Sequence, residues 1–274
     1  MEFWLRYRKN RAAVAAAGVL CLIIMVAILY PWLTPYEALS PVGKPLIPPS
    51  PGHWMGTDDL GRDCLAGVLE GTRVSLMVGF SAATISGIIG ILVGSIAGFF
   101  GKTVDNLLMR FTELFQIIPV FLLAILTVAL FGANIWFVIL VIGLLSWPST
   151  ARIVRAEFLS LKERDFVLAA RATGFSTRRI MFLEILPNAL PPVIINISLQ
   201  MASVIIIEAG LSYLGLGDPS LMSWGRMMYA AQTFLRRAPW MAIFPGLMVS
   251  VTTLSLNLLG DGLNDAFNPR LEDR

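Results

Sequence analysis

Charged residues, histidine and cysteine are all scarce in this chain. Only 14% of its 274 residues are charged, compared with about 25% in a typical soluble domain. The single histidine, His53, cannot supply the pair of histidines in an H-E-x-x-H zinc site, and no G-x-S-x-G nucleophile motif is present. The formal net charge of +3 is too small to indicate nucleic-acid binding. These shortages argue against a soluble enzyme, a metal site and a nucleic-acid-binding protein.

The two cysteines are placed too differently to predict a disulfide. Cys21 lies inside an apolar run and Cys64 in a polar segment. The first apolar run is also too long for the hydrophobic region of a signal peptide, and no small-residue cleavage site follows it. We therefore expect it to be an uncleaved membrane anchor.

Long apolar stretches dominate the chain, which is 56% hydrophobic with a mean hydropathy of +0.74. Stretches of about 18 or more uncharged residues are candidate transmembrane helices. They run over Ala12–Leu33, Val74–Gly101, Leu114–Ala151, Ile185–Ile207 and Ala238–Gly260. The third is too long for one helix and breaks at Gly132-Ala133-Asn134, which predicts two spans and a short hairpin. We predict an all-α polytopic membrane protein with about six transmembrane helices, because only helices and closed barrels satisfy the backbone in lipid.

The distribution of lysine and arginine predicts the orientation. With the N-terminus in the cytoplasm, 15 of the 21 basic residues fall on the cytoplasmic side, including Arg270 and Arg274. Positive residues concentrate in cytoplasmic segments, so both termini should be cytoplasmic. This places a proline-rich external loop at Thr34–Arg73 and one large, basic cytoplasmic loop at Arg152–Glu184.

These features divide the chain into three parts. Residues 1–70 hold the N-terminal tail, the first helix and the external loop. Residues 71–265 form a five-helix transmembrane domain with a cytoplasmic loop at about 152–187, and residues 266–274 are a cytoplasmic tail.

Several residues inside the spans invite a specific interpretation. Gly90, Gly94 and Gly98 recur every four residues, with Gly87 one turn earlier, which predicts a close helix–helix contact. Pro119 and Pro245 should kink their helices. Another residue, Glu208, follows an apolar run. At membrane depth it would be a functional candidate, but it could equally lie at a hydrated helix end.

Two polar patterns have simple structural explanations. Gly101-Lys102-Thr103 resembles the end of a P-loop, but Ile96 stands where the motif needs glycine and no strand precedes it, so we expect no ATP site. Asp58, Asp59 and Asp63 cluster with Arg62. The cluster could bind a cation, but a solvated, self-paired loop whose residues shape a turn and cap the next helix is the favoured interpretation.

The cytoplasmic loop predicts a helix, a glycine corner and a second helix. Phe166, Ala169, Ala170 and Thr173 share one small apolar helix face. Gly174 should end that helix, and Ser176 should cap a second one running to about Leu186, before Pro187. A face of small residues suits docking into the groove of a partner protein. Alternatively, the basic loop lies on anionic lipid headgroups.

This loop resembles the "EAA" loop of ABC importer permeases. The family pattern is Glu-Ala-Ala, three residues, Gly, nine residues, Ile-x-Leu-Pro. Here Ala169-Ala170, Gly174 and Leu186-Pro187 match, whereas Leu168 replaces the glutamate and Glu184 the isoleucine.

Four further motifs, in order along the chain, are similar to those of the dipeptide, oligopeptide and nickel permease subfamily. They are Gly56–Asp63, Thr72–Leu76, Leu211–Gly217 with Ser223-Trp224-Gly225, and Asn257–Leu263 with Asp265. The short external loop looks like that of the second, C-type subunit. The resemblance implies a type I ABC importer permease fold in the bacterial or archaeal inner membrane.

The resemblance also implies partners. These are a homologous first permease subunit in a heterodimer, two cytoplasmic ATPase subunits that bind ATP and Mg²⁺, an external solute-binding protein and membrane lipid. This chain would bind no cofactor or metal and would catalyse no reaction. It would form half of a pore for dipeptides, oligopeptides or a related solute such as a nickel chelate.

Residue roles follow from the same resemblance. The ATPase-coupling loop would contain Ala169, Ala170, Arg171, Gly174, Phe175, Ser176, Arg178 and Pro187. The pore or external gate candidates are Glu208, Tyr213, Leu214 and Trp224. A secondary transporter or channel acting alone is the alternative function, although no internal repeat supports it.

Overall fold

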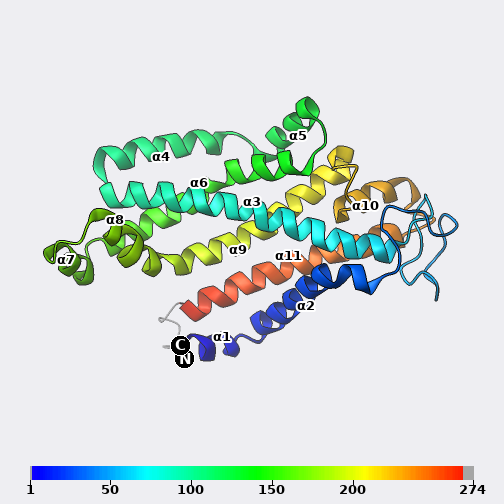
Figure 1. Ribbon diagram of the computed structural model, residues 1–274, viewed down its shortest axis with the longest axis horizontal. Helices are drawn as coiled ribbons and strands as arrows, with labels where there is room; N and C mark the ends of the chain where they lie inside the picture. The colour runs from blue at the N-terminus through cyan, green and yellow to red at the C-terminus, as the bar shows by residue number, and fades with distance from the viewer. Residues whose placement is uncertain (1, 268–274) are drawn as a thin grey trace.

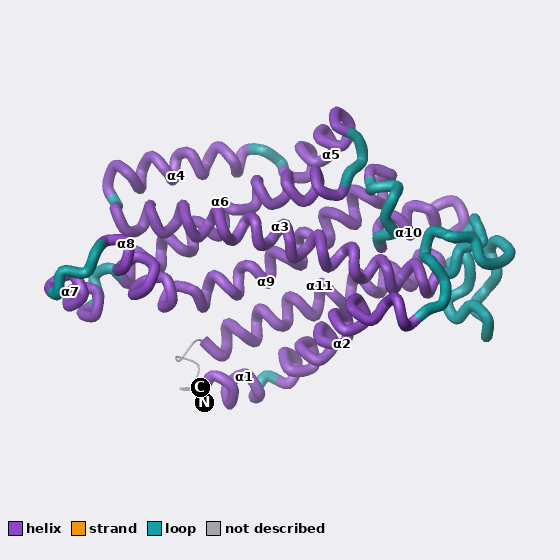
Figure 2. The backbone as a smooth tube through the Cα atoms, in the orientation of Figure 1, coloured by secondary structure: helices purple, strands orange, loops and turns teal. Residues whose placement is uncertain are grey.

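The structure, a computed structural model, describes residues 2–267, and no β-strand occurs within that range. Long helices run along one axis (Figure 1). The loop segment 34–63 lies at one end of this axis and α7 (Asp165–Ala172) at the other, and Figure 2 shows the most extensive loop region at the first of these ends. This arrangement suits a protein whose long helices cross a bilayer.

The helices are α1 (Glu2–Lys9), α2 (Arg11–Leu33), α3 (Cys64–Phe100), α4 (Lys102–Ile117), α5 (Val120–Phe131), α6 (Ile135–Leu161), α7, α8 (Thr177–Arg179), a π-helical turn η1 (Ile180–Ile185), α9 (Leu186–Leu211), a second π-helical turn η2 (Ser212–Leu216), α10 (Trp224–Ala231), the 3₁₀ turn η3 (Gln232–Phe234) and α11 (Trp240–Phe267). Among the described residues, five helical segments are long and apolar enough to cross a membrane, and the bent pair α4–α5 makes a sixth if it counts as one span. The prediction of an all-α protein with about six spans is confirmed.

Several predicted spans were too short. The helix α3 begins at Cys64, not at Val74, and α6 continues past Ala151 to Leu161. Counting only uncharged residues excluded charges that the helices accommodate. Glu70, for example, accepts a hydrogen bond from the Tyr30 hydroxyl at 3.2 Å. With 37 residues, α3 is about 55 Å long, so its ends extend beyond the hydrocarbon core.

The predicted third span is not one straight helix. The chain bends by 68° between α4 and α5, at Pro119, which precedes the first residue of α5. Proline lacks the N–H that a continuous helix needs at this point. The predicted hairpin that follows is confirmed, because Gly132 adopts a positive φ of 88° and Asn134 caps α6. The helix α11, in contrast, runs through Pro245 without interruption.

Glycines of α3 bring its backbone against α6. A Cβ added at Gly94 would overlap the carbonyl oxygen of Ala151, and one at Gly98 would overlap the Cβ of Phe158. Gly90 meets the same face of α6. Gly87 instead faces α9, so the four glycines do not share one contact surface. The result is a tight α3–α6 pair, with α9 on a neighbouring face of α3.

Polar side chains hold α9 against this pair. The amide of Gln200 accepts a hydrogen bond from the Ser86 hydroxyl of α3 at 3.0 Å and donates one to the Ser146 carbonyl of α6 at 2.7 Å. Asn196 donates to the Thr150 hydroxyl at 2.9 Å. Such bonds between membrane helices stabilise their packing and fix their register.

The two ends of the described chain lie together. The amide of Asn10 donates to Asp265 at 2.9 Å, and Tyr7 and Ala13 are buried with Ala266. They lie toward the end of the bundle that carries α7 (Figure 1), as an even number of crossings requires. Residues 268–274, which form most of the predicted C-terminal tail, lie outside the described residues.

The α3–α6 contact predicts a clear difference between two glycines. In Gly94→Ala, the added methyl group overlaps α6, so we expect the free energy of unfolding to fall by about 1–3 kcal/mol. This loss is larger than the stabilisation that alanine gains over glycine from its higher helix propensity. Thermal unfolding of the purified protein in detergent measures it. The control is Gly18→Ala in α2, where an added Cβ meets nothing within 4 Å. Equal melting temperatures for the two variants would contradict the close contact.

Candidate functional site

The corner after α7 is a Schellman motif built on Gly174. The Phe175 N–H donates to the Ala170 carbonyl at 3.1 Å, and the Gly174 N–H donates to the Arg171 carbonyl at 3.0 Å. Gly174 has a φ of 78°, which favours glycine. The predicted helix end is therefore confirmed, and it turns the chain sharply towards α8.

The second helix of the loop begins as predicted but does not end there. The Ser176 hydroxyl accepts a hydrogen bond from the Arg179 N–H at 3.4 Å and caps α8. The predicted end near Leu186 was wrong, because the helix continues through η1 and Pro187 into α9. The π-helical turn precedes Pro187 and changes the hydrogen-bond pattern where proline lacks an N–H. Residues 177–214 thus form one continuous helical segment.

The helix α7 has a buried face and an exposed face. Val167 and Ala170 pack in a core cluster with Phe158 of α6 and Ile185 of η1. The opposite face is exposed and largely apolar. It includes Phe166 at 41% and Leu168 at 46% exposure, together with Ala169, Ala172 and Thr173. We name these five residues the outer face of α7. Of the predicted apolar face, Ala170 alone points inward.

The arginines of the corner differ in their contacts. Arg171 lies over the Phe99 ring of α3, 5.7 Å from its centroid, and Arg179 lies 3.7 Å from that of Phe175. The Arg178 side chain is exposed. Two cation–π contacts therefore restrain the corner and leave one arginine available to solvent or to a partner.

The predicted gate segment is partly unwound. Gly215 breaks η2 with a φ of 82°, and residues 217–223 leave the helix. Tyr213 and Leu214 are 42% and 55% exposed and can face a pore. Trp224 is fully buried and donates to the Val68 carbonyl at 3.1 Å, so it anchors the segment and does not line an open surface.

A buried carboxylate joins four parts of the gate region. Glu208 of α9 is only 1% exposed, which excludes the hydrated helix end considered from the sequence. It accepts hydrogen bonds from the hydroxyls of Ser212 in η2 at 2.7 Å and Ser75 in α3 at 3.4 Å. Ser223, before α10, also bonds to it. Glu208 is therefore placed to position the gate segment.

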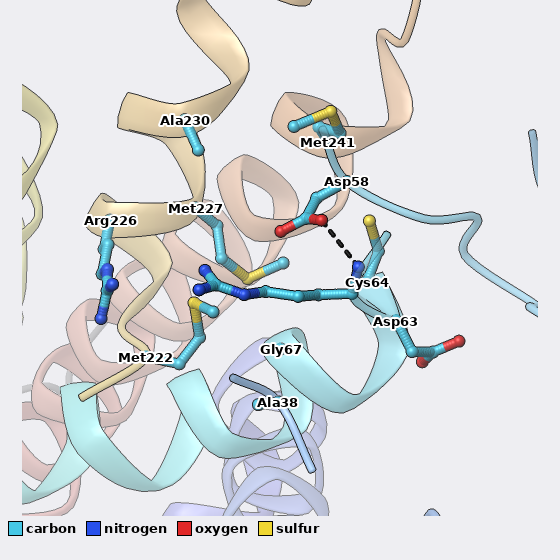
Figure 3. Close-up of a pocket in the computed structure, with 11 residues that line it drawn as sticks. Ala38, Asp58, Asp63, Cys64, Gly67, Met222, Arg226, Met227, Ala230 and Met241 are labelled. Atoms are coloured by element: carbon cyan, nitrogen blue, oxygen red, sulfur yellow. Dashed lines mark hydrogen bonds between the residues drawn. The ribbon is translucent and has the colours of Figure 1, made fainter. Parts of the chain in front are cut away.

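The acidic cluster of the loop segment 34–63 is structural and not self-paired. Asp63 caps α3, accepting from the Ala66 N–H at 2.9 Å, and its other oxygen lies 2.8 Å from Nδ1 of His53. Asp58 accepts from the backbone N–H of Arg62 at 2.7 Å, the bond drawn in Figure 3. Burial raises the pKa of Asp58. The turn-and-cap interpretation is confirmed, but Arg62 pairs with none of these carboxylates within the described part of the chain.

Sequence reasoning missed two long-range links. Asp218 accepts from the Ile135 N–H of α6 at 3.1 Å, which ties the gate segment to the α5–α6 hairpin. Burial opposes ionisation of Asp218, but bonds from Ser220 and Ile135 lower its pKa. Arg155 of α6 forms a bidentate ion pair with Asp105 of α4. No local pattern indicated either pair.

Comparison with known families gives two matches. Residues 90–273 match the model of the binding-protein-dependent transport system inner membrane component. Residues 1–49 match the N-terminal transmembrane domain of oligopeptide transport permease C.

Individual proteins agree with these matches. A dipeptide transport system permease protein of Alkalihalophilus pseudofirmus is 37% identical, over an alignment that covers 99% of this chain and 90% of that protein. An oligopeptide transport system permease protein of Bacillus subtilis is 37% identical, over an alignment that covers 97% of this chain and 88% of that protein. In fold, the chain is similar to an inward-facing methionine ABC transporter, with a TM-score of 0.59 at 18% identity, covering 74% of this chain and 97% of the other.

The Glu208 cluster predicts a large effect of one substitution. Glu208→Ala removes the shared acceptor of three buried hydroxyls and leaves a cavity. We therefore expect the free energy of unfolding, measured by thermal unfolding, to fall by at least about 2 kcal/mol. Glu208→Gln, which keeps one acceptor oxygen, should lose less. Glu113→Ala, at an exposed carboxylate of α4, is the control. A Glu208→Ala protein as stable as this control would refute the positioning role.

Proposed function

Because the chain belongs to the family of binding-protein-dependent transport system inner membrane components, we propose that it forms half of the translocation pore of an ATP-driven peptide importer. The chain is a multi-pass inner-membrane permease subunit and not itself an enzyme. The observation that carries the mechanism is the outer face of α7, which is exposed and largely apolar, on a helix whose other face is packed against the bundle.

The outer face of α7 is the proposed docking surface for an ATPase subunit. Displacement of α7 would reach α6 through the buried Val167 and Ala170, and would reach α9 through the corner at Gly174. The helical segment that begins at Thr177 is continuous as far as the exposed gate residues Tyr213 and Leu214, where Gly215 breaks it. A displacement of α7 by the ATPase would therefore move the gate residues, and no nucleotide would need to bind to this chain.

In this proposal, the other components of the transporter are separate protein chains. Two cytoplasmic ATPase subunits bind ATP and Mg²⁺, a homologous permease subunit completes the pore as a heterodimer, and an external solute-binding protein delivers the substrate. Both termini and α7 face the cytoplasm, so the loop segment 34–63 faces outward. Gly101 alone joins α3 to α4, and Lys102 and Thr103 begin α4. In this proposal the chain needs no cofactor or metal.

Peptides are the proposed substrates because the similar permeases are named for dipeptide and oligopeptide transport. A nickel chelate is the second candidate, from the subfamily resemblance alone. The binding protein would supply most of the selectivity.

Reconstitution tests this function. Proteoliposomes that contain both permease subunits and the ATPase subunits should take up labelled peptide only with the binding protein outside and ATP inside. Uptake by this chain without ATPase subunits would instead support a secondary transporter or channel.

The docking role of α7 predicts the effect of a single exposed charge. Ala169→Asp buries a carboxylate in the proposed interface, so peptide uptake should fall at least about tenfold, since such a charge costs more than about 1.4 kcal/mol. Thr103→Asp adds the same charge at an exposed position of α4 and should leave uptake unchanged. Co-purification with the ATPase subunits should be lost only in the first variant. Normal uptake by Ala169→Asp would exclude the outer face of α7 as the docking surface.

A further inference from the structure

A small cavity lies where the loop segment 34–63 meets α3, α10 and α11 (Figure 3). Its volume is about 30 Å³, which is enough for about two water-sized groups. Asp58, Arg62 and Asp63 of the loop and Arg226 of α10 line it, and sulfur-containing side chains form much of the wall. These are Cys64, Met222, Met227 and Met241.

The two arginines bring like charges to this cavity from different elements. Burial lowers the pKa of Arg226 and the positive charge of Arg62 lowers it further, whereas the negative charges of Asp218 and Glu70 oppose this shift. Arg226 is nevertheless fixed, because its Nη1 donates to the carbonyls of Pro219 and Leu221 at 2.6 and 2.7 Å. Two neighbouring cations in a partly buried site repel each other unless an anion lies between them.

Carboxylates do lie near these arginines, but none of them forms an ion pair with either one in the described part of the chain. Asp58 accepts from two backbone N–H groups, and Asp63 caps α3 and contacts His53. Within residues 2–267, neither Arg62 nor Arg226 forms an ion pair. The Nε of Arg62 is buried without a hydrogen-bond partner, and such a charged donor is costly to leave unpaired.

We propose that this cavity binds a small monovalent anion, such as chloride or formate, between Arg62 and Arg226. The unpartnered Nε supplies a donor, the two guanidinium groups supply the charge, and the volume limits the size. The wall of thioether and thiol groups has low polarity, which strengthens the attraction between the anion and the guanidinium groups. The same two positive charges disfavour a soft metal cation, despite the four sulfur atoms.

A bound anion would join two parts of the molecule. Arg62 precedes Asp63, the residue that caps α3, and Arg226 lies two residues after Trp224, which anchors the gate segment. Occupancy would therefore stabilise the contact between the loop segment 34–63 and α10. This role does not depend on which solute the protein transports.

Thermal unfolding of the purified permease complex tests the site. At constant ionic strength, replacing sodium gluconate with sodium chloride or sodium formate should raise Tm saturably, by about 2–4 °C. Gluconate is too large for the cavity and serves as the reference anion. The double variant Arg62→Gln/Arg226→Gln should lose this saturable increase, whereas Arg236→Gln/Arg237→Gln, at two exposed arginines, should keep it.

A second measurement covers the case in which the double variant does not fold. Crystals of the wild-type complex grown in sodium bromide should show an anomalous bromide peak between the two guanidinium groups. No peak there at saturating bromide, or an equal Tm increase in the double variant, would overturn the proposal.

Discussion

The close contact between α3 and α6 is the interaction on which the other parts of the structure depend. Gly94 and Gly98 remove the side chains that would separate the two backbones, and lipid provides no hydrophobic force to bring them together otherwise. Once α3 and α6 are paired, the polar groups that receive Gln200 of α9 are in place. Phe158, which Gly98 accommodates, is also buried against α7. One glycine face thus positions both the central helix α9 and the corner proposed to receive force.

The continuity of α9 connects the two functional ends of the molecule. A proline-rich start, with Pro187, Pro191 and Pro192, would ordinarily break a helix, yet the π-helical turn η1 allows the segment to pass through. A second π-helical turn ends it beside Gly215. The middle of the segment is fixed by bonds to α3 and α6, whereas both ends have irregular hydrogen bonding. Such an arrangement favours movement at the ends of α9 over bending at its centre.

Local chemistry explains which features could be predicted from the sequence. The number of spans, the Gly174 corner and the Ser176 cap depend on apolar length and on single residues with strong conformational preferences. Helix ends were missed where charges such as Glu70 are satisfied by a partner distant in sequence. The environments of Glu208 and Trp224 were missed for the same reason. Their partners Ser75 and Val68 lie 133 and 156 residues away, and no periodicity within one segment encodes such pairings.

The leucine that replaces the family's glutamate has a physical consequence for docking. Leu168 lies on the outer face of α7 and is 46% exposed, beside Ala169 and near Phe166. A glutamate there would offer a charge that a partner could bind only through a polar or basic group. Leucine instead extends an apolar surface, whose burial stabilises a complex in proportion to its area. If this face docks to an ATPase as proposed, the matching groove should be more apolar at this position than in relatives that keep the glutamate, and binding there should depend less on salt.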